Sequence, residues 1–552
     1  MLKSGAQIVA ECLIEQKVDV VFGYPGGQII NVYDALYEYS DKIRHILTSH
    51  EQGAAHAAEG YAKSSGKVGV VIATSGPGAT NLVTGIADAY MDSVPIVAIT
   101  GNVPLELLGR DSFQEVDITG ITMPITKHNY IVKDIKKLAK IIREAFVIAN
   151  TGRKGPVLID IPKNVTTDKC EFVPMKIKKP VVKKEEIENL DEVVEIIKTA
   201  KRPVIFAGGG VISSDATKEL SLFAEKMQIP VTLSFMGLGA FSPKSELYLG
   251  MLGMHGSIKA AMAIKNADVL IAIGTRFSDR VIGNRSLFAK NAKIIHIDID
   301  KAEIDKNIPT YTNICADAKK VLAKLIDLLP KTTSETHLLE IEEYSKKEAK
   351  MNLDKDLVPK LILKSAQHFT NSKTIFVTDV GQHQMWAAQY LDILSPRKFI
   401  SSGGLGTMGF GLGAAIGAAI ANPNDKVVLI TGDGSFHMNL NELATAITNN
   451  LNITIIVFNN GVLGMVRQWQ KLFFNSHFSN TTLNRKTDFV KLIEAFGGSG
   501  YRILNSEDIK KYLKLAINTK GVTLLDCVIN EDDNVLPMIP PGKSVEEIIT
   551  SM

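Results

Sequence analysis

The sequence predicts an α/β protein built from three doubly wound domains, each based on a parallel sheet. Short apolar runs alternate with helical patterns from end to end, as in chains of βαβ units. The length of 552 residues suits about three or four domains of ordinary size. Buried strands are expected in the apolar runs at residues 68–73, 95–100, 204–207, 269–273, 294–297, 427–431 and 453–458.

Two charge-rich breaks divide the chain into three parts. The first lies around residues 176–188, and the second runs from about 330 to 359. We therefore expect an N-terminal domain over residues 1–170, a central domain over 185–330 and a C-terminal domain over 355–552. Either break can also be a solvated surface helix, which is the usual meaning of a run of charges.

Composition excludes several classes of protein. The 62 basic and 59 acidic residues give a net charge of +3, and no basic cluster is interleaved with aromatic residues. Nucleic-acid binding is therefore not expected. A hydrophobic share of 45% and a charged share of 22% are typical of a soluble globular protein. Glycine, with 43 residues, is concentrated in a few short loops.

The cysteines and the N-terminus indicate a cytoplasmic protein outside the membrane. The four cysteines are far apart and lack the spacing of zinc ligands, so we expect free thiols in a reducing compartment. No signal-peptide core precedes the first helical pattern. The charge-free stretch 399–424 is long enough to cross a bilayer, but its seven glycines favour a loop that opens onto a buried helix.

The most specific local pattern is KVVLITGDGSFHMNLNELATAITNNLNITIIVFNNG at residues 426–461. One strand runs into GDGS, a helical pattern covers about 439–449, and a second strand runs into Asn459 and Asn460. In a right-handed βαβ unit, Asp433 and Asn460 emerge at the same carboxyl edge of the sheet. One carboxylate and one amide oxygen, completed by water and phosphate oxygens, suit Mg²⁺. The sequence therefore predicts a magnesium and phosphate site here.

Two other interpretations of this segment remain open. A Rossmann dinucleotide site is one, but GDGS follows the strand where G-x-G-x-x-G is expected, and the next strand ends in Asn where an acid is expected. A glycine turn followed by an Asn-Gly turn, with no ligand, is the other.

The segment resembles the diphosphate motif of thiamine-diphosphate (ThDP) enzymes. Its parts GDGSFHMNLNELATA and NNGVLGMVRQWQ are similar to the catalytic subunit of the acetohydroxyacid synthase (acetolactate synthase) family. Further matches span nearly the whole chain: VFGYPGG at 21–27, TSHEQGAAHAAEG at 48–60, TSGPGATN at 74–81, DSFQEVD at 111–117, KGPVLIDIPK at 154–163, GQHQMWAAQY at 381–390 and PMIPPGK at 537–543. The resemblance implies a pyrimidine-binding N-terminal domain, an FAD-binding Rossmann-like central domain, and a C-terminal domain for diphosphate and Mg²⁺ that ends in a lid tail.

Glu51 is the expected catalytic residue. A carboxylic group hydrogen-bonded to the aminopyrimidine of ThDP drives the tautomer change that helps to remove the thiazolium proton. From the sequence alone, an acid before the small-residue helix 53–62 is more often a helix-dipole stabiliser, and the resemblance reverses that interpretation. It also implies that Glu51 and Asp433 of one site come from two subunits of a homodimer or of a dimer of dimers. The other implied ThDP contacts are Gly381, Gln382, His383, Met408, Gly434, Ser435 and Met465.

The resemblance also implies the substrates and a second cofactor. Pyruvate is decarboxylated on ThDP, and the hydroxyethyl carbanion joins a second pyruvate to give 2-acetolactate, or 2-oxobutyrate to give 2-aceto-2-hydroxybutyrate. Arg280 offers a planar fork for the acceptor carboxylate, and Trp469 shapes the pocket in favour of 2-oxobutyrate. Further pocket positions are Phe113, Gln114 and Lys163, with Met254, Met465 and Val466 as apolar wall. FAD is expected at Arg153, His255, Arg276, Asp298 and Asp317. Without the resemblance, a core aromatic and a surface ion pair explain Trp469 and Arg280 equally well.

The family's biosynthetic branch, which makes the first common intermediate of valine, leucine and isoleucine synthesis, is favoured by RFSDR at 276–280. That branch implies a separate regulatory small subunit. A catabolic acetolactate synthase for acetoin formation and a pyruvate oxidase-like ThDP/FAD enzyme are the alternatives. A non-catalytic nucleotide-binding protein on the same fold is disfavoured, because Glu51 and Asp433 are both present. Two residues depart from the family pattern: Ser278 stands where Asp is usual, and Leu412 where Pro is usual.

Overall fold

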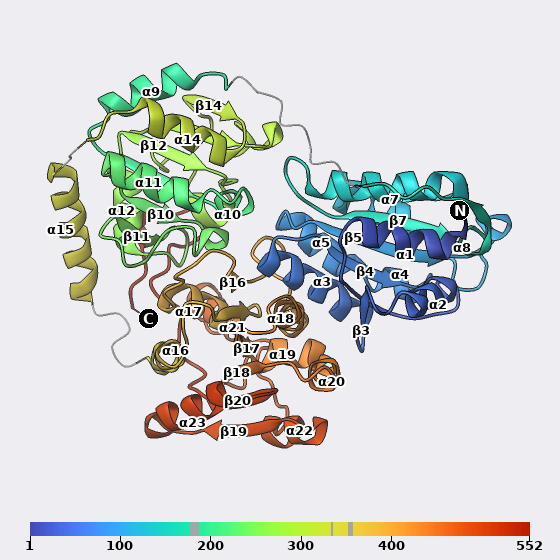
Figure 1. Ribbon diagram of the computed structural model, residues 1–552. Coiled ribbons are helices and arrows are strands. Elements are labelled where there is room, and N and C mark those ends of the chain that lie inside the picture. Colours follow the sequence, from blue (N-terminus) through green and yellow to red (C-terminus); the bar gives the residue numbers. More distant parts are fainter. Residues whose placement is uncertain (177–186, 333–334, 352–356, 552) are drawn as a thin grey trace.

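The computed structural model describes residues 1–176, 187–332, 335–351 and 357–551, and it forms three lobes (Figure 1). Each lobe is built on a six-stranded sheet in which every neighbouring pair of strands is parallel. The predicted fold class is therefore confirmed. All seven predicted strands are present, with their ends shifted by two residues at most.

The N-terminal sheet has the order β3-β2-β4-β5-β7-β6. Its strands are β2 (Val20–Tyr24), β3 (Arg44–Leu47), β4 (Gly69–Ala73), β5 (Ile96–Asn102), β6 (His128–Ile131) and β7 (Val157–Pro162). The helices of this lobe are α1 (Gly5–Glu15), α2 (Ile30–Glu38), α3 (Glu51–Ser65), α4 (Pro77–Thr80), α5 (Val83–Met91), α6 (Ile118–Thr122), α7 (Ile135–Asn150) and α8 (Lys163–Thr167). A small antiparallel pair, β1 (Leu2–Ser4) with β8 (Lys169–Glu171), joins the two ends of the lobe.

The central sheet has the order β11-β10-β9-β12-β13-β14. Counted along the chain this is 3-2-1-4-5-6, the strand order of the Rossmann dinucleotide fold. Its strands are β9 (Pro203–Ala207), β10 (Val231–Leu233), β11 (Tyr248–Met251), β12 (Val269–Ile273), β13 (Lys293–Asp298) and β14 (Thr312–Cys315). Its helices are α9 (Leu190–Thr199), α10 (Gly209–Ser213), α11 (Thr217–Met227), α12 (Ile258–Asn266), α13 (Asp279–Ile282) and α14 (Ala318–Leu328).

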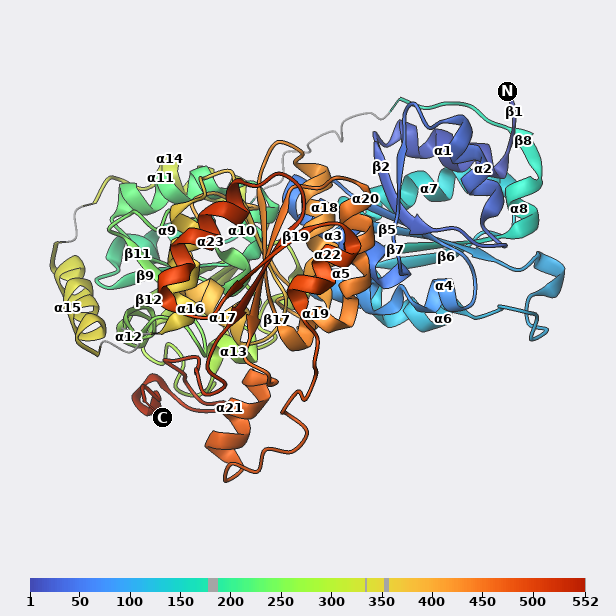
Figure 2. The same cartoon turned by 90° about the horizontal axis from the view of Figure 1, so that it is seen from below.

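The C-terminal sheet has the order β16-β15-β17-β18-β20-β19. Its strands are β15 (Ile375–Thr378), β16 (Phe399–Ile400), β17 (Val427–Gly432), β18 (Ile453–Asn459), β19 (Ser499–Ile503) and β20 (Thr523–Val528). Its helices are α16 (Val358–His368), α17 (Gln382–Tyr390), α18 (Phe410–Ala421), α19 (Asp433–Asn439), α20 (Leu443–Thr448), α21 (Gly464–Phe473), α22 (Phe489–Phe496) and α23 (Ser506–Asn518). The last part of the chain packs beside α12, where Lys265 forms an ion pair with Glu546 (Figure 2).

The charge-free stretch at residues 399–424 forms a loop followed by the buried helix α18, as predicted. This helix packs against α3 of the N-terminal lobe. A Cβ on Gly417 would lie 1.8 Å from the Ala57 carbonyl oxygen, and one on Gly60 would lie 2.1 Å from the Ala414 carbonyl oxygen. Glycine is therefore required here by the close approach of two helices. None of the helices in the described part of the chain combines the length and apolar character needed to span a bilayer.

Two expectations about local structure differ from what is observed. The helix after β17 begins at Asp433, six residues before the predicted start at 439, because the Ser435 hydroxyl accepts the Gly432 N–H and closes the first turn. The GDGS segment is thus a helix start and not a loop. The second charge-rich break contains the helix α15 (Glu335–Met351). Residues 333–334 and 352–356 of that break, and most of the first break, 177–186, lie outside the described residues.

Candidate active site

Asp433 and Asn460 meet at the carboxyl edge of the C-terminal sheet. The strands that precede them, β17 and β18, are neighbours in register. The Asp433 carboxylate accepts the N–H of Gly434 and the N–H of Gly461, each at 3.0 Å. Burial raises the pKa of the Asp433 carboxyl to about 6. The two side chains offer one carboxylate and one amide oxygen, a donor set that fits Mg²⁺ completed by phosphate and water.

The predicted diphosphate residues lie beside this pair. Gly381 and Gln382 form the start of α17, and Gly434 and Ser435 belong to the first turn of α19, so N–H groups of two helix starts lie at one edge. His383 is buried, and burial lowers its pKa to about 3, which keeps the ring neutral. Among the described residues, its Nε2 atom has no hydrogen-bond partner. An unpartnered buried nitrogen at this edge is suited to a phosphate oxygen.

The glycine loop that carries Met408 is fixed by a buried carboxylate. Asp379, just after β15, accepts the N–H of Gly409 at 2.8 Å and the N–H of Gly411 at 3.2 Å. Burial raises the pKa of Asp379 to about 6. The Met408 Cε atom would lie 3.9 Å from a Cβ on Gly434. Met408 therefore lies next to the proposed diphosphate site.

Glu51 lies in a separate group of residues, on the N-terminal sheet. It is the first residue of α3, just after β3, where a strand gives way to a helix as predicted. Asn81 donates its side-chain N–H to Glu51 Oε2 at 2.9 Å. The glycine turn at Gly76 lies against Gln114, because a Cβ on this glycine would lie 2.9 Å from Gln114 Cα. Lys163 begins α8 at the end of β7. Phe113 leaves 84% of its surface exposed.

Glu442 joins α3 to the C-terminal lobe, and sequence reasoning did not find it. Its carboxylate accepts the N–H of His50 at 2.9 Å and the N–H of Ser49 at 3.1 Å. It thereby fixes the start of the helix that carries Glu51. Within the described residues we find no hydrogen bond or ion pair between the Glu51 group and the Asp433 group. Glu51 and Asp433 thus belong to two separate groups of residues, one on each outer sheet, which are two candidate half-sites.

The predicted flavin residues and some of the predicted acceptor residues line one cavity of about 1840 Å³ between the three lobes. All five predicted flavin contacts, Arg153, His255, Arg276, Asp298 and Asp317, are part of its wall. Arg280, Trp469, Met254, Met408, Met465, Val466 and Gly381 line it as well. The guanidinium carbon of Arg280 lies 5.9 Å from the centre of the Trp469 ring, a cation–π contact. Glu51, Phe113, Gln114 and Lys163 are not part of this wall.

The central part of the cavity has the features of a dinucleotide site. A Cβ on Gly208, at the end of β9, would lie 2.2 Å from the Gly274 carbonyl oxygen, so the turn needs glycine. Asp298 ends β13, the next strand but one from β9 in the sheet, and its carboxylate lines the same cavity. Burial lowers the pKa of His255 to about 4. With the 3-2-1-4-5-6 strand order, these residues fit FAD.

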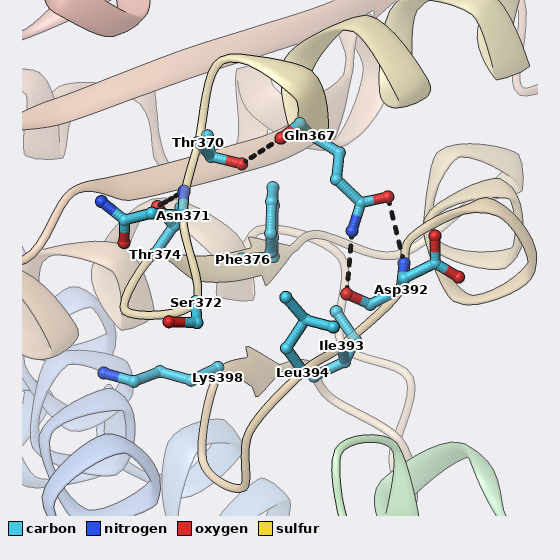
Figure 3. Close-up of a pocket in the computed structure, with 10 residues that line it drawn as sticks. All are labelled: Gln367, Thr370, Asn371, Ser372, Thr374, Phe376, Asp392, Ile393, Leu394 and Lys398. Atoms are coloured by element: carbon cyan, nitrogen blue, oxygen red, sulfur yellow. Dashed lines mark hydrogen bonds between the residues drawn. The ribbon is translucent and has the colours of Figure 1, made fainter. Parts of the chain in front are cut away.

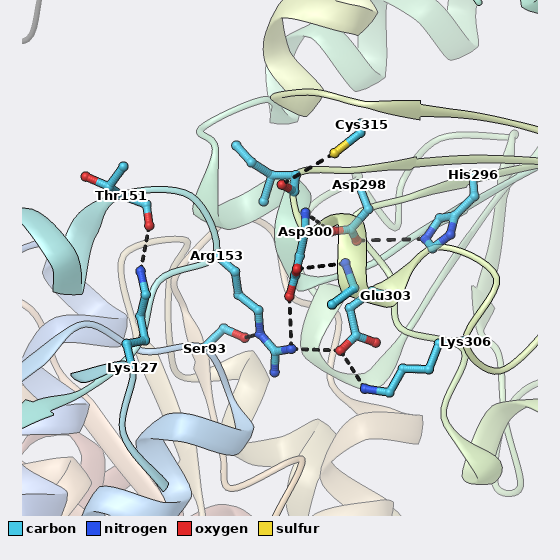
Figure 4. A network of polar contacts seen from close by, with 12 residues as sticks. Ser93, Lys127, Thr151, Arg153, His296, Asp298, Asp300, Glu303, Lys306 and Cys315 are labelled. Carbon is cyan, nitrogen blue, oxygen red and sulfur yellow. Dashed lines mark hydrogen bonds and ion pairs between the residues drawn. The ribbon is translucent and has the colours of Figure 1, made fainter. Parts of the chain in front are cut away.

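Arg153 ties the N-terminal lobe to the central lobe at the cavity wall (Figure 4). Its Nη1 donates to Glu303 at 2.7 Å and to Asp300 at 3.4 Å, while its Nε donates to Ser93 at 2.9 Å. Lys306 forms a second ion pair with Glu303 at 2.9 Å. Glu303 was missed as a single residue, because its partner Arg153 is distant in the sequence.

The two residues that depart from the family pattern, Ser278 and Leu412, lie in well-defined places in the fold. Ser278 is the cap residue before α13, and it lines the cavity beside Arg280. Leu412 is buried within α18. A separate small cavity of about 50 Å³ lies beside α16 (Figure 3), and none of the predicted site residues belongs to it.

Similarity to known proteins agrees with this arrangement. Three family models match consecutive parts of the chain: the N-terminal TPP binding domain of thiamine pyrophosphate enzymes at residues 3–121, the central domain at 190–325 and the C-terminal TPP binding domain at 379–527. Together with the fold, these matches define the protein as a thiamine pyrophosphate enzyme.

Relatives that match the chain over its full length identify its family within the thiamine pyrophosphate enzymes. The chain is 44% identical to the acetolactate synthase large subunit of Cyanidium caldarium, covering 100% of this chain and 97% of that one. It is 47% identical to a probable acetolactate synthase large subunit of Methanocaldococcus jannaschii, covering 99% and 95%. With the Corynebacterium glutamicum large subunit the identity is 46%, over 99% and 90%. The chain belongs to the acetolactate synthase large subunits, and the predicted family is confirmed.

Proposed function

We propose that this chain catalyses the decarboxylation of pyruvate and the transfer of its remaining two carbons to a second 2-oxo acid. The products are 2-acetolactate from pyruvate and 2-aceto-2-hydroxybutyrate from 2-oxobutyrate, within branched-chain amino-acid biosynthesis. The proposal rests mainly on the Arg280–Trp469 pair, which lines the same cavity as the residues that fit a dinucleotide. The similarity to acetolactate synthases over the full length of the chain agrees with it.

The two half-sites give each residue a role. Asp433 and Asn460 hold Mg²⁺, while the starts of α17 and α19, His383 and Ser435 bind the diphosphate. Bound ThDP supplies a carbon nucleophile that also accepts the electrons released on loss of CO₂. The Glu51 carboxyl holds and returns the proton at the aminopyrimidine nitrogen. Met408 and Met465 place an apolar surface against the cofactor.

The acceptor acid is held at the other end of the cavity. Arg280 donates from two nitrogens to its carboxylate, and Trp469 contacts its alkyl group. Phe113, Gln114 and Lys163 complete the pocket from the N-terminal lobe of a second copy. This arrangement requires a homodimer, or a dimer of dimers, because Glu51 and Asp433 of one site then belong to different chains.

FAD is proposed at Arg153, His255, Arg276, Asp298 and Asp317 with a structural role. The names of the relatives include "large subunit", and on that basis we propose a separate small regulatory subunit for this chain. The free cysteines agree with the cytoplasmic location that the sequence predicts.

Purified full-length protein tests the proposal. We expect flavin absorbance, and acetolactate formed from pyruvate only when ThDP and Mg²⁺ are both present. A colourless but active protein supports the catabolic alternative. Reduction of the flavin at the rate of pyruvate consumption supports the oxidase alternative, and the absence of both activities contradicts the proposal.

A further inference from the structure

A chain of side-chain amides connects the proposed metal ligand Asn460 to the C-terminal tail. Asn460 donates from Nδ2 to Gln382 Oε1 at 3.4 Å. Gln382 donates from Nε2 to Gln468 Oε1 at 3.1 Å and to the Asp533 carbonyl at 2.9 Å. Gln468 in turn makes two bonds with the main chain of Val535: it donates to the carbonyl at 3.0 Å and accepts the N–H at 2.9 Å.

The chain is buried and tightly built. Gln382 and Gln468 expose 4% and 1% of their surfaces, and Val535 exposes none. Gln468 is the only residue of α21 that is buried, so this helix turns an amide, and not an apolar side chain, towards the interior. A Cβ on Gly464 would lie 1.9 Å from Gln382 Oε1 and 2.8 Å from Asn460 Nδ2. The glycine therefore leaves room for the first bond of the chain.

The order of donors and acceptors fixes the direction of every amide. A main-chain peptide does not rotate, so the N–H and carbonyl of Val535 decide which end of the Gln468 amide carries the oxygen. That oxygen attracts Gln382 Nε2, which leaves Gln382 Oε1 facing Asn460. Asn460 then turns its Nδ2 towards Gln382, and its Oδ1 is left on the other side, where it also accepts the Val462 N–H at 3.2 Å.

The direction of the Asn460 amide matters because only its oxygen binds Mg²⁺. With Gln382 reversed, its NH₂ group faces the NH₂ group of Asn460, donor against donor. Asn460 then loses its bond to Gln382, and the Val462 N–H is left to hold its amide against reversal. A reversed amide presents to the metal a nitrogen that has no free lone pair for coordination. Partners that orient a metal ligand typically change metal affinity by about 10- to 100-fold when they are removed.

We propose that Gln468 is a positioning residue, which uses the main chain of the C-terminal tail to orient Asn460 towards Mg²⁺ through Gln382. This inference rests on the proposed function for the metal site itself. Gln468 also binds the main chain of Val535, which lies two residues after Asp533. Loss of the Gln468 amide therefore removes one hydrogen-bond partner of Gln382 and loosens the other, the Asp533 carbonyl. The tail is thereby part of the metal site without touching the metal.

Metal binding without turnover tests the proposal. The affinity of Mn²⁺, a paramagnetic substitute for Mg²⁺, is measured by electron paramagnetic resonance on the full-length protein with ThDP and without pyruvate. We expect Gln468→Met, which keeps the size and removes the amide, to weaken Mn²⁺ binding about tenfold. Gln468→Glu keeps the acceptor for Gln382 and for Val535, and it should stay within about threefold of the wild type.

The chain offers a matched control in Gln367 (Figure 3). This side chain makes the same two bonds to a main-chain residue, accepting the Asp392 N–H at 3.2 Å and donating to the Asp392 carbonyl at 2.8 Å. It has no link to the metal site, so Gln367→Met should leave Mn²⁺ affinity unchanged. A second control is Gln389→Met, which removes a bond to the tail at Leu536 outside the amide chain.

The outcomes distinguish a failure of the Gln468 proposal from a failure of the proposed metal site. Equal Mn²⁺ affinity in Gln468→Met and wild type overturns the role of Gln468, as does an equal loss in Gln367→Met or Gln389→Met. If the wild type binds no Mn²⁺ in the presence of ThDP, the proposed metal site fails, and this inference fails with it.

Discussion

The N-terminal and C-terminal sheets have the same topology but carry different chemistry. Counted along the chain from β2 and from β15, both have the strand order 2-1-3-4-6-5. The fourth strand of each sheet has seven residues and ends in an asparagine, Asn102 in β5 and Asn459 in β18. Each asparagine donates to an aspartate on the sixth strand, Asp160 and Asp526 respectively. The shared pairs indicate one scaffold used twice.

The two copies differ at the next residues, which in the C-terminal sheet are the proposed metal ligands. By strand register, Ser75 and Val103 of the N-terminal sheet take the places of Asp433 and Asn460. One hydroxyl and one isopropyl group cannot replace a carboxylate and an amide as metal ligands. The N-terminal sheet has its acid, Glu51, after a different strand. Two copies of one fold thus supply two complementary half-sites, and the function follows from the edge residues.

The largest effect is expected from the N-terminal half-site. Glu51→Gln removes the proton carrier but keeps the shape, so acetolactate formation should fall by at least about 100-fold. ThDP and Mg²⁺ should still bind, because the C-terminal edge holds them. Turnover and equilibrium ThDP binding measure the two effects. Glu144→Gln, at an exposed position on α7, is the control and should keep full activity. Unchanged turnover in Glu51→Gln contradicts the assignment.

A smaller effect is expected at the two equivalent aspartates, Asp160 and Asp526, because their charged neighbours differ between the two sheets. Arg502 pairs with Asp526 at 2.9 Å, whereas Asp160 is held by Thr100 and Asn102. Burial raises the pKa of Asp160 to about 7. The folded protein therefore keeps this proton up to about pH 7, while the unfolded chain releases it near pH 4, so rising pH favours unfolding between these values.

Asp160→Asn tests this difference. In the wild type this group lowers the free energy of unfolding by about 2–3 kcal/mol between pH 5 and pH 7, and the substitution should remove that decrease. Denaturant unfolding at several pH values measures it. The matched variant Asp526→Asn should keep the decrease, because Asp160 is intact. An identical pH dependence in wild type and Asp160→Asn rules out a neutral Asp160.

The sequence predicted much of this arrangement, for reasons that can be stated. The buried parallel strands are continuous apolar runs, and the adjacency of Asp433 and Asn460 follows from the handedness of a βαβ unit. Glu51 was predicted from the family resemblance, because an acidic residue at a helix start is also explained by stabilisation of the helix dipole. Glu442, Glu303 and the Gln468–Val535 pair were not predicted. Their hydrogen bonds join residues that are 67 to 393 positions apart in the sequence, and a local residue pattern cannot predict such contacts.

The smallest effect is expected at the acceptor end of the cavity, where the C-terminal lobe meets the central lobe. Trp469→Phe weakens the contact with Arg280 and removes part of the surface against the acceptor's alkyl group. We expect the preference for 2-oxobutyrate over pyruvate to fall by about threefold to tenfold. Competition between the two acceptors measures it. Phe478→Leu, which alters a ring packed against Arg467, should leave the preference unchanged.

The central claim, that one active site takes its halves from two chains, is tested most directly by mixing two inactive variants. Glu51→Gln lacks the N-terminal half-site, and Asp433→Ala lacks the C-terminal one. Random pairing of equal amounts makes half of the dimers mixed, and each mixed dimer contains one intact site, so activity should recover to about a quarter of the wild-type value. If the mixture shows no more acetolactate formation than the two variants measured separately, the half-sites belong to the same chain and the account is wrong.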